Sequence, residues 1–209
     1  MAVIKSGATS DQLTIDPISK AARVTLYDAN GRETSLASKR TYAVSGTFTP
    51  AATPTDLVTI IGSGTTTIRV LSLIITTTTT ATASHQFFLI KRSTVDTGGT
   101  FVSLTPVSYD SDDAAATAVA GHWTANPSAL GTVVGTLHTM RVASPVPVPG
   151  SFAGIVHNAG FDIIEDADSS LLSKAITLRG VTQQLALNYN GVALVAGQTH
   201  AYRLLWIEE

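Results

Sequence analysis

The chain has 209 residues and a mass of 21.7 kDa, a size that suits one compact domain whose core needs neither a metal nor a disulfide. It contains no cysteine, which excludes disulfides, thiolate metal sites and cysteine nucleophiles. Thirteen basic and fifteen acidic residues give a formal net charge of -2, so charge alone favours neither nucleic acid nor an anionic membrane as a partner.

The hydropathy pattern argues against a membrane protein. Mean hydropathy is +0.25, yet every uninterrupted apolar run is far too short to cross a bilayer as a helix. Residues 1–7 show no basic region followed by an apolar stretch. We therefore expect no secretory signal, no membrane partner and synthesis in a cytoplasm.

Composition divides the chain into an arm, residues 1–40, and a body, residues 41–209. The arm has six basic and four acidic residues, a balance of +2, whereas the body has seven basic and eleven acidic residues, a balance of -4. Two short β-like runs in the arm flank Asp16-Pro17, and Asn30-Gly31 follows as a turn signal. So few apolar side chains cannot build a core, so we expect the arm to lie on its own body, a sister subunit or a larger surface.

The body has the pattern of a β protein. Residues 68–75 mix alternation with an apolar, β-branched run, which predicts a strand covered on both faces. Alternation over 184–189 precedes Asn190-Gly191 and the run 192–195, which predicts a two-residue type I′ hairpin. Residues 114–120 are alanine-rich and predict at most one or two helical turns in a loop. Strands are expected at 41–48, 57–61, 68–78, 86–92, 100–104, 132–141, 151–157, 175–178, 184–189 and 199–207.

Ten short strands without a long helix predict an all-β fold. The strand number suits a jelly-roll-like two-sheet antiparallel β-sandwich, preceded by the extended N-terminal arm. Residues 76–80 are a threonine run that imitates an ice- or glycan-binding hydroxyl array, but an exposed strand end is favoured because the array does not recur. Prolines alternate over 145–149 and predict an extended edge that blocks further strand pairing.

The sequence contains no recognisable catalytic constellation. Its five histidines are scattered without the close pairing that seeds a metal site. Two acidic runs, 110–113 and 165–168, concentrate the oxygen ligands that calcium prefers, although a solvated loop is favoured for both. Lys91 and Arg92 either meet a phosphate or acidic partner or are strand-end cations that reach solvent over apolar stems. We predict neither enzymatic activity nor a cofactor.

Turn and strand signatures recur along nearly the whole chain, at residues 4–11, 13–17, 20–28, 89–93, 98–100, 126–127, 130–131, 178–180, 185–191 and 205–209. In these segments the chain resembles virion structural proteins of tailed bacteriophages. The resemblance implies a non-enzymatic virion structural protein, a group that includes head decoration, tail and fibre proteins. The division into arm and body favours a capsid decoration or cement protein on the outside of the head. The resemblance also implies that the partners are the major capsid protein, other virion proteins and further copies in a homotrimer.

Such a protein gains affinity for a repeating shell through a symmetric body and a peptide arm. The arm is therefore expected to anchor the protein, and the body to trimerise and project. Four basic side chains of the arm are candidates for contacts with an acidic capsid surface: Lys5, Lys20, Arg23 and Arg32.

A tail or fibre protein that binds a host glycan is the alternative. Glycan sites place aromatic side chains beside hydrogen-bonding groups. Trp123 with Asp110, Asp112 and Asp113 is the candidate ligand loop, although Trp123 is equally suited to fill a core or a subunit interface. A hydrolase on a β scaffold is disfavoured, because no paired carboxylates have a recognised spacing.

Overall fold

The computed structural model describes residues 39–79, 81–144, 157–162, 175–195 and 197–209, and the backbone of 14–15 and 22–23. The chain divides into two compact units, Met1–Lys39 and Arg40–Glu209. In the first unit, β1 (Thr14–Ile15) pairs antiparallel with β2 (Ala22–Arg23). The second unit is all-β, and its described residues contain no helix, and hence none that could cross a membrane.

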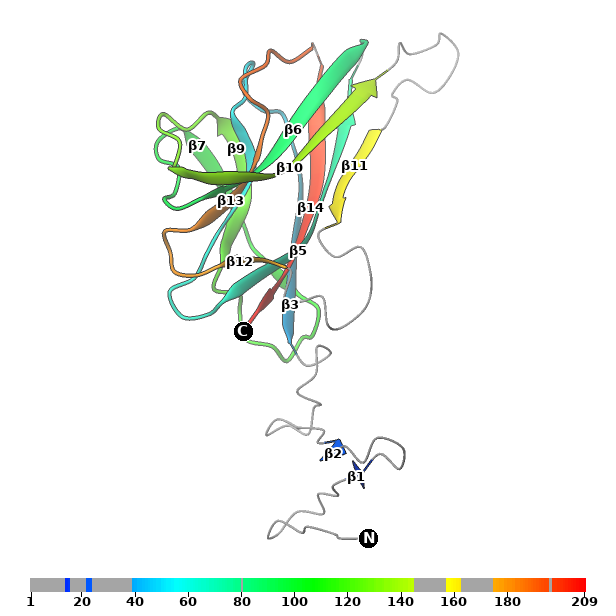
Figure 1. Cartoon of the computed structure of the whole chain (residues 1–209). Coiled ribbons are helices and arrows are strands. Elements are labelled where there is room, and N and C mark those ends of the chain that lie inside the picture. The colour runs from blue at the N-terminus through cyan, green and yellow to red at the C-terminus, as the bar shows by residue number, and fades with distance from the viewer. Residues whose placement is uncertain are drawn as a thin grey trace. The chain divides into compact units, whose positions relative to one another are not determined.

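Two antiparallel sheets form the second unit (Figure 1). The first sheet has the strand order β10-β6-β13-β4-β9-β7, and the second has the order β11-β5-β14-β3-β8, with β12 pairing with β5 beside β11. The strands are β3 (Arg40–Phe48), β4 (Asp56–Ile61), β5 (Ile68–Thr78), β6 (Ala83–Arg92), β7 (Thr100–Leu104), β8 (Val107–Ser108), β9 (Val119–Ala125), β10 (Val133–Ser144), β11 (His157–Asp162), β12 (Ile176–Leu178), β13 (Gln184–Asn188) and β14 (Thr199–Glu208).

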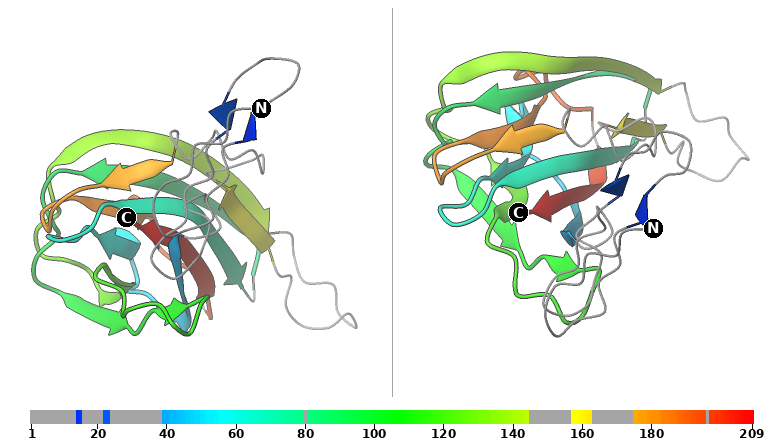
Figure 2. Two further views of the ribbon diagram at one scale, coloured as in Figure 1. Left: turned by 90° about the horizontal axis from the view of Figure 1, so that it is seen from below. Right: turned by 60° about the horizontal axis from the view of Figure 1, so that its bottom comes forward.

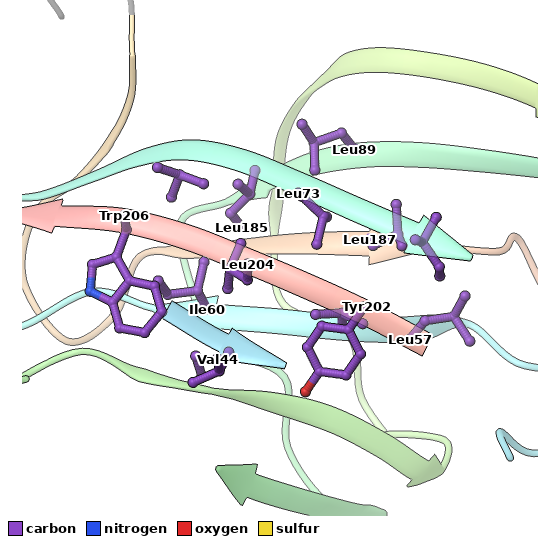
Figure 3. Close-up of a cluster of buried hydrophobic side chains, with 14 of the residues drawn as sticks. Val44, Leu57, Ile60, Leu73, Leu89, Leu185, Leu187, Tyr202, Leu204 and Trp206 are labelled. Atoms are coloured by element: carbon purple, nitrogen blue, oxygen red, sulfur yellow. The ribbon is translucent and has the colours of Figure 1, made fainter. Parts of the chain in front are cut away.

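The sheets pack face to face as a sandwich, which confirms the predicted fold class (Figure 2). From β3 to β6 the chain alternates between the sheets at every strand, as jelly-roll connectivity requires. Antiparallel strands with one buried face alternate apolar and polar residues, and β14 does so by turning Tyr202, Leu204 and Trp206 inward. These side chains meet Ile60, Leu185 and others from the first sheet (Figure 3).

Strand β5 is long and central, but only one of its faces is fully buried. Its buried positions alternate up to Val70, shift by one residue, and alternate again from Leu73. The shift coincides with an irregular register between β14 and β5, where Trp206 pairs with Val70 and Leu205 pairs with Ser72. The prediction of a strand covered on both faces was therefore wrong, because a bulge rather than double burial produces the apolar run.

Two local predictions fail for reasons of tertiary structure. The predicted helical turns at 114–120 are instead a loop that leads into β9, whose residues 119–122 pair with β4. Asn190 and Gly191 both have positive φ, as a type I′ turn requires, but residues 192–195 form no second hairpin strand. Leu194 N–H donates to Ala52 O instead, because β13 already lies between β4 and β6. Of the strand predicted at 151–157, only residue 157 is described, as the first residue of β11, and 151–156 lie outside the described residues.

Two connections cross the first sheet on its outer face. The chain must pass over β13, β4 and β9 to travel from β6 to β7, and it passes back over β4, β13 and β6 to travel from β9 to β10. We call these two segments, residues 93–99 and 126–132, the crossing connections. They run beside each other, with backbone hydrogen bonds in both directions between Thr97 and Ala129.

Candidate functional site

The largest group of buried charged side chains lies under the crossing connections. Leu185 and Leu187 of β13 face the core, so Gln184 and Asn188 of the same strand face the opposite, outer side of the sheet. There they meet Asp56, Arg92 and Asp96, and all five side chains are buried. We call this group the carboxylate network.

Arg92 is the centre of the carboxylate network. Its Nε and Nη2 donate to the two oxygens of Asp56 at 3.0 and 2.9 Å, and its Nη1 donates to Gly131 O at 2.8 Å. This bidentate geometry is the strongest form of arginine–carboxylate pairing. Arg92 thus meets an acidic group of its own chain, whereas the predictions of an external phosphate or acidic partner and of a solvent-exposed cation are wrong for Arg92, because the crossing connections enclose its side chain.

Asp96 joins both crossing connections to the sheet. Its Oδ1 accepts from Gly131 N at 2.7 Å and its Oδ2 accepts from Gln184 Nε2 at 2.6 Å, while its own N–H donates to Gln184 Oε1. Burial, together with the neighbouring Asp56 carboxylate, raises the pKa of Asp96 to about 7. The other acid of the network, Asp56, accepts a further hydrogen bond from Asn188 Nδ2.

Glycine permits the close approach of the crossing connections. A Cβ atom on Gly131 would lie 1.9 Å from Thr94 O, and one on Gly99 would lie 2.2 Å from Asn126 O. Asn126 then fastens the second connection to the chain before β4, because its side chain accepts from Thr55 N and donates to Thr53 O. The backbone contacts and the carboxylate network together hold the connections against the sheet.

A second buried polar group, which we call the histidine cluster, lies between the sheets. It comprises His85, His122, His200, Tyr189 and Tyr202, which come from both sheets and are all buried. Most of these residues lie far apart in the sequence, so their spacing did not indicate that they would form one buried cluster. Among the described residues, no group of three or more metal-ligating side chains is arranged to hold a metal ion.

Hydrogen bonds in the histidine cluster fit neutral imidazoles. The amide Nε2 of Gln198 donates to His200 Nε2 at 3.1 Å, and Thr77 Oγ1 lies 2.9 Å from His200 Nδ1. Burial, with a smaller contribution from His85, lowers the pKa of His200 to about 3. Burial also lowers the pKa of His122, whose ring stacks on Phe48 with centroids 4.4 Å apart.

A third buried acid, Glu208, is the last residue of the C-terminal strand β14. Its carboxylate accepts from Thr117 and Ala118 N–H groups at 3.0 Å and from Trp206 Nε1 at 3.1 Å. Burial raises the pKa of Glu208, but these hydrogen bonds outweigh burial and leave it below its ordinary value. The contacts hold the loop before β9 against the C-terminal strand.

The predicted ligand loop is not assembled as one exposed site. Trp123 is only 6% exposed, its ring lies against Phe101 with centroids 5.0 Å apart, and its Nε1 has no hydrogen-bond partner. Asp110, Asp112 and Asp113 form a turn between β8 and β9, in which Asp112 N donates to Asp110 Oδ1. The burial of Trp123 favours its interpretation as a packing residue.

Several predictions fall outside the described residues. Lys5, Lys20 and Arg32 lie there, as do the acidic run 165–168 and the prolines of 145–149. Arg23 is described only by its backbone, which pairs with Thr14. In the threonine run, Thr77 and Thr79 are buried, so an exposed hydroxyl array over the run does not form.

Nothing in the sequence indicated that Asp56, Asp96 and Gln184 form part of a site. Its one local feature is that Asp56 directly precedes the predicted strand at 57–61, whose residues are apolar apart from Thr59. Comparisons of the chain with protein-family models, with curated proteins and with solved structures find no match.

Proposed function

We propose that this chain is a structural protein of a tailed-bacteriophage virion, a decoration or cement protein that binds the outside of the head and stabilises it through its N-terminal arm. One observation carries the proposal most directly. Five of the segments that carry the resemblance to phage virion proteins lie apart in sequence, yet they lie in or beside one part of the body. Residues 89–93 carry Arg92, residues 98–100, 126–127 and 130–131 belong to the crossing connections or adjoin them, and 185–191 include Asn188.

The buried architecture supports a mechanical role. Substrate would need access to the carboxylates or imidazoles in order to react, but Asp56, Asp96 and His200 are at most 8% exposed. Their hydrogen bonds instead fasten loops to sheets, which stiffens a sandwich that must withstand strain on a shell. The arm then has the role of binding, with basic side chains directed to an acidic capsid surface and many weak contacts summed over the shell.

Strand β10 offers a surface for self-association, which the expected homotrimer requires. It is an edge strand of the first sheet, and Val133, Val134 and Leu137 on it are 55%, 62% and 48% exposed. Residues 132–140 contain no acidic or basic residue apart from His138. A neighbouring copy presents the same uncharged apolar strip, so two copies match in polarity, whereas a partner recognised by charge finds no counter-ion there.

The location of the chain in the virion tests the proposal. Purified virions are separated into heads and tails, and the chain is counted in each fraction by quantitative mass spectrometry. Decoration requires that it fractionates with heads at copy numbers comparable to the symmetry sites of the shell. A few copies confined to tails would instead favour the receptor-binding alternative.

The arm and the oligomer have separate tests. Deletion of residues 1–40 is expected to abolish binding to heads while circular dichroism shows a folded β body; retained binding would contradict the anchoring role. Val134→Asp with Leu137→Asp is expected to lower the mass measured by light scattering from trimer to monomer. Val181→Asp is the matched control, since Val181 is 61% exposed outside β10.

A further inference from the structure

The two carboxylates of the carboxylate network, Asp56 and Asp96, form ion pairs with the same guanidinium, that of Arg92. Arg92 Nε lies 3.0 Å from Asp56 Oδ2 and 3.5 Å from Asp96 Oδ1, so both acids approach the same nitrogen. The side chains of Asp56 and Asp96 have no exposed surface, and that of Arg92 has 2%. Water therefore cannot screen the repulsion between the two carboxylates as it does at a surface.

The charges that face the network can be counted element by element. Strand β4 contributes Asp56, β6 contributes Arg92, and the first crossing connection contributes Asp96. Strand β13 contributes only the neutral Gln184 and Asn188, and residues 126–132 contain no charged side chain. On β9 the titratable side chain is His122, which stacks on Phe48 in the core, on the other side of the sheet.

Two ionised aspartates against one arginine leave this buried group with a net charge of -1. Binding of one proton makes it neutral, and burial in a low dielectric strongly favours the neutral form. We propose that Asp56 and Asp96 share one proton from mildly acidic to about neutral pH, and that loss of this proton loosens the crossing connections from the outer face of the sheet.

Hydrogen-bond geometry indicates which acid carries the proton. Asp56 accepts three hydrogen bonds from Arg92 and Asn188, so both of its oxygens are already occupied as acceptors. Asp96 accepts one hydrogen bond on each oxygen, from Gly131 and from Gln184. A protonated Asp96 can donate a hydrogen bond to the neighbouring Asp56 carboxylate, while its oxygens still accept from Gly131 and Gln184, so the proton adds a hydrogen bond without removing another.

The sign of the effect on stability is opposite to that of ordinary ion-paired acids. The pKa of Asp96 is raised from 3.8 to about 7, so between these values the folded protein holds a proton that the unfolded chain has released. Stability from this group is therefore fully present below about pH 4 and is lost as the pH rises to about 7. Asp96 links both crossing connections to the sheet, so the connections are held less tightly when Asp96 loses its proton and the carboxylate network becomes negative.

Asp96→Asn tests the proposal through the pH dependence of unfolding. Asparagine cannot ionise, so the folding equilibrium constant of the wild type is expected to fall relative to that of the variant, about tenfold per pH unit between about pH 4 and pH 7. The amide nitrogen cannot accept, so the variant loses one hydrogen bond at every pH. Because that loss is the same at every pH, it does not change the slope of the unfolding free energy against pH, and this slope is the quantity that is compared. Asp112→Asn is the matched control, because Asp112 lies on an exposed turn.

Parallel wild-type and Asp96→Asn curves of unfolding against pH would overturn the proposal. Should the variant not fold, carbon-13 NMR of the wild-type aspartate carboxyls replaces the comparison. One carboxyl that titrates near neutral pH, and is unaffected in Asp112→Asn, is the expected result. Complete ionisation of every aspartate by pH 5 in the folded protein would contradict the proposal.

Discussion

The carboxylate network and the histidine cluster both bury titratable side chains, but they do so on opposite faces of the first sheet and by different means. The network keeps formal charges, satisfied by an arginine and by backbone groups under the crossing connections. The histidine cluster packs its rings against aromatic residues between the sheets, where burial lowers the pKa of His122 and of His200. A buried charge needs a partner at hydrogen-bonding distance, whereas a buried imidazole can avoid charge by releasing its proton.

The two regions give opposite dependences of stability on pH. His200 has its pKa lowered from 6.5 to about 3, so acid between these values favours the unfolded chain, which binds the proton more tightly. Asp96 favours the folded state in acid. From about pH 4 to 6.5 the two effects oppose each other, so the wild type is expected to show a flatter profile than either single-site variant.

The largest expected effect comes from removing the His200 titration. In the wild type, the His200 titration is expected to lower the free energy of unfolding by about 1.4 kcal/mol for each pH unit of acidification, or about 5 kcal/mol over the whole pKa shift from 6.5 to about 3. His200→Gln should abolish this loss. Urea unfolding from pH 3 to 7 measures it, and stability of the variant should then fall with rising pH through the remaining Asp96 effect. His138→Gln, at an exposed histidine, is the control; a variant profile that parallels the wild type would refute the neutral imidazole.

Removing Arg92 should break the carboxylate network. Arg92→Met leaves Asp56 buried without its counter-charge, which is expected to reduce the free energy of unfolding by about 3–5 kcal/mol at neutral pH. Chemical denaturation of the wild type and the variant at neutral pH measures the difference, and equal unfolding free energies would contradict the role of Arg92. Arg141→Met is the matched control on an exposed position, with an expected change within about 0.5 kcal/mol.

A methyl group between the crossing connections should separate them. Gly131→Ala places a Cβ 1.9 Å from Thr94 O, so the backbone must shift, at an expected cost of about 1–3 kcal/mol. Gly135→Ala is an internal control four residues along the chain, because a Cβ there has no heavy atom within 4 Å. Thermal unfolding compares the two, and equal melting temperatures would show that the connections are not closely held.

Two buried threonines give the smallest and most selective test. Thr77→Val removes a hydroxyl 2.9 Å from His200 Nδ1 and should cost about 1 kcal/mol. Thr59→Val replaces a buried hydroxyl that has no hydrogen-bond partner, so it should leave stability unchanged or raise it. Calorimetry measures the stability of both variants. A larger loss of stability from Thr59→Val than from Thr77→Val would contradict the interpretation of the Thr59 hydroxyl as a group without a hydrogen-bond partner.

Prediction from sequence succeeded where a signal was local. The bounds of β5 and β7 were predicted to the residue, because alternation, β-branched side chains and flanking turn residues are all short-range features. The whole of β9 was missed; its first residues follow an alanine-rich segment whose composition favours helix locally, whereas pairing with β4 decides the structure. Asn190 and Gly191 adopt the expected turn, yet tertiary pairing of β13 removes the hairpin.

The candidate sites were much less predictable than the strands. Arg92 was singled out, but its partners Asp56 and Asp96 were not, because the crossing connections bring them together. Of the histidines, three meet only once β6, β9 and β14 occupy their places in two sheets. Trp123 was predicted as a candidate for contact with an external ligand, but its side chain is buried and offers no exposed binding surface.

The sequence by itself determined that the chain forms an antiparallel β-sandwich, because the period of two in its apolar residues can be buried only by stacking sheets. It also determined that no thiol contributes to the chemistry. Only the tertiary structure decided which polar residues became buried partners, and on which face of a sheet. Residue contacts across a sandwich depend on strand order and on where connections cross, and these long-range choices leave no periodic trace in the chain.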